Sequence, residues 1–189
     1  MSIPGIRIIA GDWRGRKLVS PKGDVTRPTA SRAREALFSM LVSRLGGMTG
    51  LHVADFYAGS GALGLEALSR NAAHCLFVER DRGALDALNA NIAALAVGDR
   101  TTVRAAIVGA AGAPVRPVDL ALFDPPYGET GIDALLTSMG ERSWFAEGAW
   151  LSVETGHDEN PAPTGFTVDV RRDVGKARIT LLQFDSRLA

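Results

Sequence analysis

The stretch LHVADFYAGSGALG, residues Leu51–Gly64, decides the fold of this chain. A short apolar run ends in Asp55, and Gly59, Gly61 and Gly64 follow at the spacing G-x-G-x-x-G. This order predicts a strand, a tight turn and a helix. Glycines let the backbone approach a ligand closely, and the first N–H groups of a helix lack partners within it. We therefore expect a nucleotide-binding crevice in an α/β sheet, with a tight turn that holds no ligand as the alternative.

Segments with the patterns of helices and strands alternate along the rest of the chain. Apolar residues at helical spacing predict a helix that follows Thr29 or Ser31 and stops at Gly46, and further helices over Ala62–Arg70, Arg82–Leu95 and Thr130–Arg142. Short apolar runs predict strands over Cys75–Glu79, Thr101–Ile107, Val118–Phe123 and Trp150–Val153, and then a hairpin of Phe166–Val170 and Ala177–Phe184. This alternation predicts a mostly parallel sheet with an antiparallel edge.

Length and composition limit the possible classes of protein. The 189 residues, 46% of them hydrophobic, fit one domain with an appendage, and we expect an arm over residues 1–28 and a main domain over residues 29–189. No apolar run approaches the roughly 18 residues of a membrane helix, and the start of the chain lacks a signal-peptide core, so we expect a cytoplasmic protein. The single Cys75 excludes an internal disulfide, and three scattered histidines predict no metal site.

Charge is distributed unevenly between the two ends of the chain. Residues 1–46 contain nine basic and three acidic residues, a net charge of +6, and the remainder carries −6. Such a basic segment favours contact with a polyanion, although a solvated arginine-rich surface is the alternative.

The basic segment begins with a predicted hairpin. Ile6–Ala10 and Arg14–Val19 flank the turn residues Gly11 and Asp12, and cations surround Trp13. Cations beside an aromatic ring suit phosphate contact and base stacking. The candidate residues for binding a nucleic acid are Arg7, Trp13, Arg14, Arg16, Lys17, Arg27 and Arg32. Packing of Trp13 within the hairpin itself is the alternative for that residue.

Polar residues also mark the ends of two predicted strands. Glu79 lies eighteen positions after Gly61, where a carboxylate commonly accepts hydrogen bonds from ribose hydroxyls; a surface acid is the alternative. Asp124-Pro125-Pro126-Tyr127 follows the fourth strand. Two prolines fix the backbone and donate no N–H, so nearby carbonyls stay available as acceptors beside a carboxylate and an aromatic ring. Such a group suits a planar exocyclic amine of a nucleobase, with a simple Asp-Pro turn as the alternative.

Three separated segments resemble, in order, the bacterial 16S ribosomal RNA guanine-N2 methyltransferase family. RIIAGDWRGRKL with TRPTASRAREALF resembles its N-terminal signature, DFYAGSGALGLEALSR its cofactor motif, and DPPY the motif IV of amino-group methyltransferases. The resemblance implies a Rossmann-like class I methyltransferase fold with a seven-stranded, mostly parallel sheet whose last strand is antiparallel, preceded by a small basic hairpin and a helix. It also implies S-adenosylmethionine as methyl donor and a guanine N2 of 16S rRNA, naked or in a 30S assembly particle, as acceptor.

The resemblance assigns roles to particular residues. It implies that the target base is bound and methylated at Asp124, Pro125, Pro126 and Tyr127. It implies that the cofactor is bound by Asp55, Phe56, Tyr57, Ala58, Gly59, Ser60, Gly61, Glu79, Arg80, Ile107 and Asp124. One departure concerns adenine: Arg104–Ile107 lacks the acid or amide that such families place after the third strand. We expect backbone groups near Ala106 and Ile107, and packing by Arg80 and Ile107, to take its place.

Other functions compete with this one. The DPPY segment also serves adenine amines, which leaves a DNA adenine-N6 methyltransferase open, although 189 residues give little room for a sequence-reading domain. An NAD(P)-dependent reductase would use the glycine turn but leave the DPPY segment without a role. A non-catalytic RNA-binding factor with the same fold is the third alternative. We expect a monomer without a metal ion.

Overall fold

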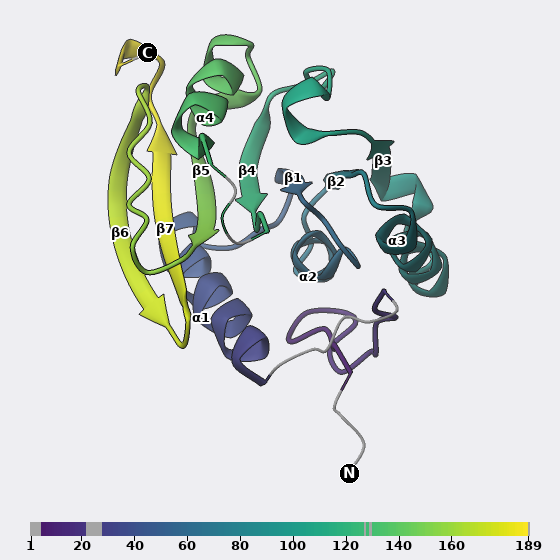
Figure 1. The fold of residues 1–189 in the computed structure, drawn as a ribbon. Helices are drawn as coiled ribbons and strands as arrows, with labels where there is room; N and C mark the ends of the chain where they lie inside the picture. Colours follow the sequence, from purple (N-terminus) through teal and green to yellow (C-terminus); the bar gives the residue numbers. More distant parts are fainter. Residues whose placement is uncertain (1–4, 22–27, 127, 129, 189) are drawn as a thin grey trace.

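Strand β1 (His52–Phe56) is the third strand in a seven-stranded sheet of strand order β3-β2-β1-β4-β5-β7-β6 (Figure 1). This computed structural model describes residues 5–21, 28–126, 128 and 130–188. The other strands are β2 (His74–Glu79), β3 (Thr101–Ala105), β4 (Val118–Phe123), β5 (Phe145–Thr155), β6 (Phe166–Val174) and β7 (Ala177–Phe184). The helices are α1 (Pro28–Leu45), α2 (Ala62–Ser69), α3 (Arg82–Leu95) and α4 (Ile132–Glu141), with short 3-10 turns at Gly98–Arg100, Val108–Ala110 and Ser186–Leu188.

The strand directions confirm the predicted fold class. Strands β1 to β5 pair in parallel, and β7 is antiparallel to both β5 and β6. The chain moves outward from β1 through β2 to β3, and then returns to β4 on the other side of β1. In an open parallel sheet, the carboxyl ends of the strands at such a reversal form the ligand crevice. The reversal in this sheet is between β1 and β4, so the sequence-predicted site residues that follow these two strands stand where this fold is expected to bind its ligand.

Alternating side chains of the central strands divide the core between the two faces of the sheet. Leu120 and Leu122 of β4 join the cluster under α1, α2 and α3. Ala121 and Phe123 join the cluster on the other face, where α4 packs. Cys75 is fully buried in the first cluster, which confirms the prediction of a small core residue. No helix among the residues described above is long and apolar enough to cross a membrane.

Several boundaries differ from the predicted ones. Helix α1 begins at Pro28, predicted as part of a link, because proline suits the first position of a helix, where its missing N–H is not needed. Strand β5 begins at Phe145 rather than Trp150, since an irregularity in its pairing with β4 lets an interrupted strand continue past Gly148, whose φ is +74°. Strand β3 ends at Ala105 because the carbonyl of Ile107 accepts the N–H groups of Ala110 and Ala111 in a turn.

The arm, residues 5–21, is a hairpin without regular strands. Its two halves form one isolated antiparallel bridge, Arg7 with Lys17, so the predicted hairpin is present but its halves are too short to count as strands. The Ile8 N–H still donates to the Arg16 carbonyl at 3.0 Å. Ile8 and Leu18 are buried within the cluster under α1, α2 and α3, so the arm shares the core of the main domain.

Candidate active site

The turn between β1 and α2 has a backbone that few sequences can adopt. Gly59 and Gly61 have φ values of +56° and +80°, and Tyr57 takes a φ of +59° despite its side chain. A Cβ atom at Gly61 would collide with the side chain of Leu88. Backbone strain at a non-glycine residue costs of order 1–3 kcal/mol and is concentrated at functional sites. The cofactor turn, residues 57–61, therefore has the tight backbone that its glycines predict, and it packs against Leu88 of α3 at Gly61.

Asp55 supports this turn from inside the protein. Its side chain is buried, and its Oδ2 accepts the N–H of Gly64 at 2.8 Å, in the first turn of α2. Burial raises the pKa of Asp55 well above its usual range, and the nearby carboxylates of Asp124 and Glu79 add to the effect. Asp55 therefore positions the start of α2, and its side chain is enclosed rather than presented to a ligand.

Glu79 joins the end of β2 to the cofactor turn. Its Oε2 accepts the N–H of Gly59 at 2.8 Å, while its Oε1 accepts the N–H groups of Arg80 and Asp81 at 2.7 and 2.8 Å. A carboxylate oxygen offers about two acceptor directions, so Oε2 keeps one for a ribose hydroxyl. Glu79 thus has room for one ligand hydroxyl while it holds the turn.

Asp124-Pro125-Pro126 begins beside the cofactor turn. Phe56 and Phe123 are partners in the β1–β4 register, and their rings stack at 4.4 Å. The next residues, Tyr57 and Asp124, therefore leave adjacent strands at the same edge of the sheet. Asp124 is exposed, and its charge reaches both Asp55 and Glu154. The two predicted halves of the site meet here, while Tyr127 lies outside the described residues.

Glu154 is a site residue that the sequence reading missed. Val153 of β5 pairs with Phe123 of β4, so Glu154 and Asp124 occupy neighbouring positions. Burial raises the pKa of Glu154 from 4.5 to about 7, with a further contribution from the charge of Asp124. The sequence does hold a signal for it, an acid at the carboxyl end of a predicted strand, as at Glu79. Together Glu79, Asp55, Asp124 and Glu154 form a carboxyl row at the ends of β2, β1, β4 and β5.

The region predicted to receive adenine has an exposed apolar side chain. Ile107 is 59% exposed just after β3, and Arg80 is exposed after β2. The Ala106 N–H already donates to the Glu79 carbonyl at 2.9 Å, and the Ile107 carbonyl already accepts two N–H groups. Packing against Ile107 and Arg80 therefore fits a purine ring better than those backbone groups do. The tight turn, one hydroxyl acceptor and an apolar face together fit an adenosyl group.

The predicted RNA-binding residues of the arm divide into exposed cations and one packed ring. Exposed positions are Arg7, Arg14, Arg16, Lys17 and Arg32. Trp13 is half-buried against the core, and the Arg100 guanidinium lies over its ring, 5.6 Å from the centroid. The structure thus places this ring in a packing contact. Arg27 is outside the described residues.

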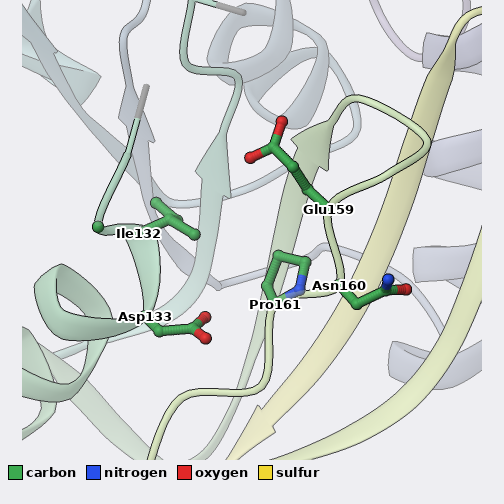
Figure 2. A pocket seen from close by; sticks show the side chains of 6 residues that line it. Ile132, Asp133, Glu159, Asn160 and Pro161 are labelled. Atoms are coloured by element: carbon green, nitrogen blue, oxygen red, sulfur yellow. The ribbon is translucent and has the colours of Figure 1, made fainter. Parts of the chain in front are cut away.

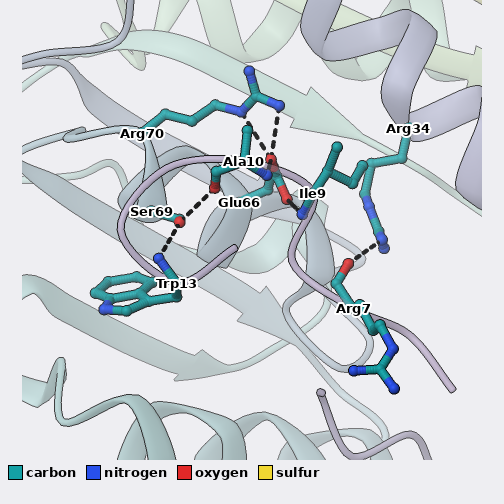
Figure 3. A network of polar contacts seen from close by, with 8 residues as sticks. All are labelled: Arg7, Ile9, Ala10, Trp13, Arg34, Glu66, Ser69 and Arg70. Atoms are coloured by element: carbon teal, nitrogen blue, oxygen red, sulfur yellow. Dashed lines mark hydrogen bonds and ion pairs between the residues drawn. The ribbon is translucent and has the colours of Figure 1, made fainter. Parts of the chain in front are cut away.

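Side chains of α2 hold the arm through its backbone (Figure 3). Glu66 is fully buried, and its two oxygens accept the N–H groups of Ile9 and Ala10 at 2.7 and 3.0 Å. Arg70 pairs with the same carboxylate at 2.8 Å. The Ser69 hydroxyl donates to the Ala10 carbonyl at 2.6 Å and accepts the Trp13 N–H at 3.0 Å. The helix that starts at the cofactor turn therefore also fixes the arm.

A separate cavity of about 280 Å³ lies between the start of α4 and the segment after β5 (Figure 2). Ile132 and Asp133 stand on one side, and Glu159, Asn160 and Pro161 on the other. Asp133 and Glu159 already accept backbone N–H groups, from Ala162 and Gly156 respectively. The lining contains none of the predicted site residues, so this cavity is distinct from the crevice at β1 and β4. Within the described part of the chain, no three His, Cys, Asp or Glu side chains are grouped to hold a metal ion.

Comparisons with known proteins agree with this geometry. The family described as "Conserved hypothetical protein 95" matches residues 6–183. The chain is 37% identical over 159 residues to "Ribosomal RNA small subunit methyltransferase D" of Escherichia coli K12, covering 84% of this chain and 78% of that protein. It is 34% identical over 174 residues to "Putative rRNA methyltransferase YlbH" of Bacillus subtilis, covering 89% and 92%.

A solved structure matches over nearly the whole chain. "Putative methyltransferase yhhF from Escherichia coli" superposes with a TM-score of 0.83 at 31% identity, covering 97% of this chain and 99% of that one. The match includes the arm, the cofactor turn and the β4 end within one alignment. The chain therefore belongs to the ribosomal RNA small subunit methyltransferase D family, to which the description "Conserved hypothetical protein 95" applies.

Proposed function

We propose that this protein is an S-adenosylmethionine-dependent rRNA methyltransferase that methylates the exocyclic N2 of a guanine in 16S rRNA. Family membership supports the rRNA methyltransferase activity and the cofactor. The β1–β4 register supports an exocyclic amine as the methylated group, because it brings Asp124-Pro125-Pro126 to the edge of the cofactor turn. A carboxylate and proline carbonyls beside a cofactor crevice suit an amine that has two hydrogens to donate.

Residues at the ends of three strands would each bind a different part of the cofactor. The cofactor turn would cradle the methionine part, Glu79 would accept a ribose hydroxyl through Oε2, and the exposed Ile107 with Arg80 would cover the adenine ring. When bound, the cofactor supplies an electrophilic methyl group on a sulfonium: the bond from nitrogen to methyl forms as the bond from sulfur to methyl breaks, and the nitrogen loses one proton to water.

Asp124 and Pro125 orient the target nitrogen. Its lone pair is delocalised into the purine ring, so it points poorly at an electrophile. Hydrogen bonds from its two N–H groups to the Asp124 carboxylate and the Pro125 carbonyl would hold these hydrogens out of the ring plane and localise the lone pair. Good orientation of two reactants supplies about 7–11 kcal/mol of a barrier in well-aligned cases. The ionised Asp124 also stabilises positive charge that develops on the nitrogen.

The exposed cations of the arm would bind the RNA backbone. Unstacking the target base costs a few kcal/mol, least in a loop or single strand, which favours a loop of 16S rRNA or of a 30S assembly particle as substrate. We further propose a cytoplasmic monomer, with residues 1–28 as the RNA-binding arm and residues 29–189 as the catalytic domain.

Replacement of Asp124 tests the proposed role of the β4 end. Asp124→Ala should lower methyl transfer to 16S rRNA or 30S particles by about 10²–10³-fold, because a preorganised charge at the reacting nitrogen is lost. S-adenosylmethionine binding, measured by calorimetry, should change little. The matched control is Asp133→Ala, which removes a carboxylate near the separate cavity. Unchanged turnover of Asp124→Ala would refute the proposed role.

The identity of the methylated nucleoside separates the remaining functions. RNA and DNA labelled by the wild-type protein are digested to nucleosides and analysed by mass spectrometry. N2-methylguanosine in RNA is the expected product. N6-methyladenine in DNA would identify a DNA methyltransferase instead, and RNA binding without cofactor binding would identify a non-catalytic factor.

A further inference from the structure

Asn91 of α3 contacts both the arm and the cofactor turn. Its side chain is 1% exposed. The Oδ1 atom accepts the N–H of Val19 at 2.7 Å, and the Nδ2 group donates to the carbonyls of Val19 and Ser60 at 3.0 and 2.9 Å. Ser60 belongs to the cofactor turn and Val19 to the end of the arm. One buried amide thus connects two segments that are 41 positions apart in the sequence.

This connection differs from the contacts by which α2 holds the arm. Glu66 and Ser69 bind the arm at Ile9, Ala10 and Trp13, and they lie in the second half of α2 rather than in the turn. The Asn91 amide instead contacts backbone of the arm and of the turn at once. Its N–H groups donate to carbonyls on both sides, and a buried amide that loses such partners incurs a desolvation cost.

The two segments that Asn91 connects are the ones expected to bind the two substrates. The cofactor turn contains three left-handed residues in five, Tyr57, Gly59 and Gly61, so a ligand that contacts it selects one of few backbone conformations. A fixed Ser60 carbonyl fixes the Asn91 side chain, and this in turn fixes Val19. Thermodynamic linkage makes this effect reciprocal. If cofactor binding to the turn raises the affinity of the arm for RNA by some factor, RNA binding to the arm raises the affinity of the turn for the cofactor by the same factor.

We propose that Asn91 is a positioning residue that couples the cofactor turn to the arm, so that cofactor binding orders Val19 and RNA binding on the arm tightens cofactor binding. The identity of the two ligands rests on the function proposed above. The coupling itself concerns only the backbone groups that Asn91 joins.

Amide hydrogen exchange of the full-length protein tests the coupling with S-adenosylmethionine alone. Saturating S-adenosylmethionine should slow exchange of the Val19 N–H at least about five-fold in the wild type, the lower end of ordinary coupling between sites. The N–H groups of Ile9 and Ala10, held by Glu66, are internal controls and should not change. In Asn91→Leu the cofactor should leave Val19 exchange unaltered.

Two further variants keep the test decisive. Asn91→Asp conserves size and the acceptor for Val19 but removes both N–H donors, so it replaces Asn91→Leu if that variant does not fold. Ser69→Ala loosens the arm without touching the turn, and should retain the cofactor-dependent protection of Val19. Equal protection in wild type and Asn91→Asp, or none in the wild type with cofactor bound, would overturn the coupling.

A binding cycle with RNA gives the reciprocal measurement. A 16S rRNA fragment should lower the wild-type Kd for S-adenosylmethionine at least about five-fold, and leave that of Asn91→Asp unchanged. A wild-type protein that binds no S-adenosylmethionine would overturn the proposed function and the coupling with it. A protein that binds both ligands independently would overturn the coupling alone.

Discussion

At the residue scale, Glu154 links the active site to pH. Its pKa is raised from 4.5 to about 7, first by burial and then by the charge of Asp124. The folded state therefore binds the Glu154 proton more tightly than the unfolded state does. Below pH 4.5 this acid is protonated in both states and does not reduce the free energy of unfolding. Between pH 4.5 and 7 it ionises in the unfolded state before it does in the folded state, so the free energy of unfolding falls as the pH rises through this range.

Glu154→Gln should remove this cost. At pH 8 we expect the free energy of unfolding of the variant to be higher than that of the wild type by at most about 3 kcal/mol. This upper limit is the rise in the pKa of Glu154 multiplied by about 1.36 kcal/mol for each tenfold change in proton affinity. At a pH of about 4.5 the gain should largely disappear, because most of the proton affinity difference is no longer expressed. Urea unfolding between these pH values measures the difference. Glu141→Gln, an exposed acid of α4, controls for the lost charge; a gain independent of pH would contradict the assignment.

Gly61 is the second residue whose replacement separates two physical effects. Alanine there would keep a left-handed φ of +80° and would also press its Cβ against Leu88. Gly46 is a matched control, since it has a φ of +70° and a Cβ atom added there would meet no other atom within 4 Å. Gly46→Ala therefore measures the conformational cost alone, roughly 1–2 kcal/mol.

Gly61→Ala should destabilise the protein by about 1–3 kcal/mol more than Gly46→Ala does, because overpacking adds to the conformational cost. It should also abolish S-adenosylmethionine binding, which Gly46→Ala should leave intact. Urea unfolding and calorimetric titration measure the two effects. Equal destabilisation by both variants would show that Leu88 moves aside without cost.

At the scale of elements, α2 has a different task at each end. Its start is held by the Asp55 carboxylate beneath the cofactor turn, and its second half holds the arm through Glu66 and Ser69. Breaking a buried ion pair by removal of one partner costs about 3–5 kcal/mol, and Glu66 additionally accepts two backbone N–H groups. Loss of this carboxylate should therefore weaken the attachment of the arm substantially, although Ser69 and Asn91 also bind it.

Glu66→Ala should release the arm before the sheet unfolds. The N–H groups of Ile9 and Ala10 would lose their acceptor, and Arg70 would lose its carboxylate partner. We therefore expect trypsin to cut within the arm, at Arg14, Arg16 and Lys17, at least about tenfold faster than in the wild type. A tenfold increase corresponds to a decrease of about 1.4 kcal/mol in the free energy of local opening. Mass spectrometry of the fragments identifies the sites. Asp86→Ala, an exposed acid of α3, is the control. Arm cleavage at the wild-type rate would mean that the remaining contacts, from Ser69, Asn91 and the buried apolar side chains of the arm, hold it without Glu66.

The elements also show what a sequence can predict. The order of helices and strands followed from local periodicity. The cofactor turn and the DPPY segment were singled out by the types and spacing of residues that are close together in the chain. The early start of β5 and the loss of regular strands in the arm depend on distant partners. Glu66 bonds to residues 56 and 57 positions away, and Glu154 meets Asp124 only through the register of β4 and β5.

At the scale of the whole molecule, negative and positive groups are separated. The carboxyl row lies at the ends of β2, β1, β4 and β5, which suits a cationic sulfonium and a developing ammonium. The exposed cations Arg7, Arg14, Arg16, Lys17 and Arg32 lie on the arm and α1. A polyanion would be attracted to these cations and repelled by the carboxyl row, so the backbone of the RNA and its target base would be directed to different parts of the surface.

The salt dependence of RNA binding measures how many of these cations are used. If all five contact phosphates, log K should fall with log salt at a slope near −3.5, from roughly 0.7 per contact on single strands. Replacing Arg14, Arg16 and Lys17 together by alanine should reduce the slope to about −1.4 by the same relation. Fluorescence anisotropy with a labelled 16S rRNA fragment between about 50 and 400 mM KCl measures it. Arg116→Ala, an exposed cation before β4 at the opposite edge of the sheet, should leave the slope unchanged, since the amino ends of the parallel strands face away from the crevice. A wild-type slope near zero, or a slope that the arm substitutions do not alter, would mean that the RNA reaches the active site without the arm.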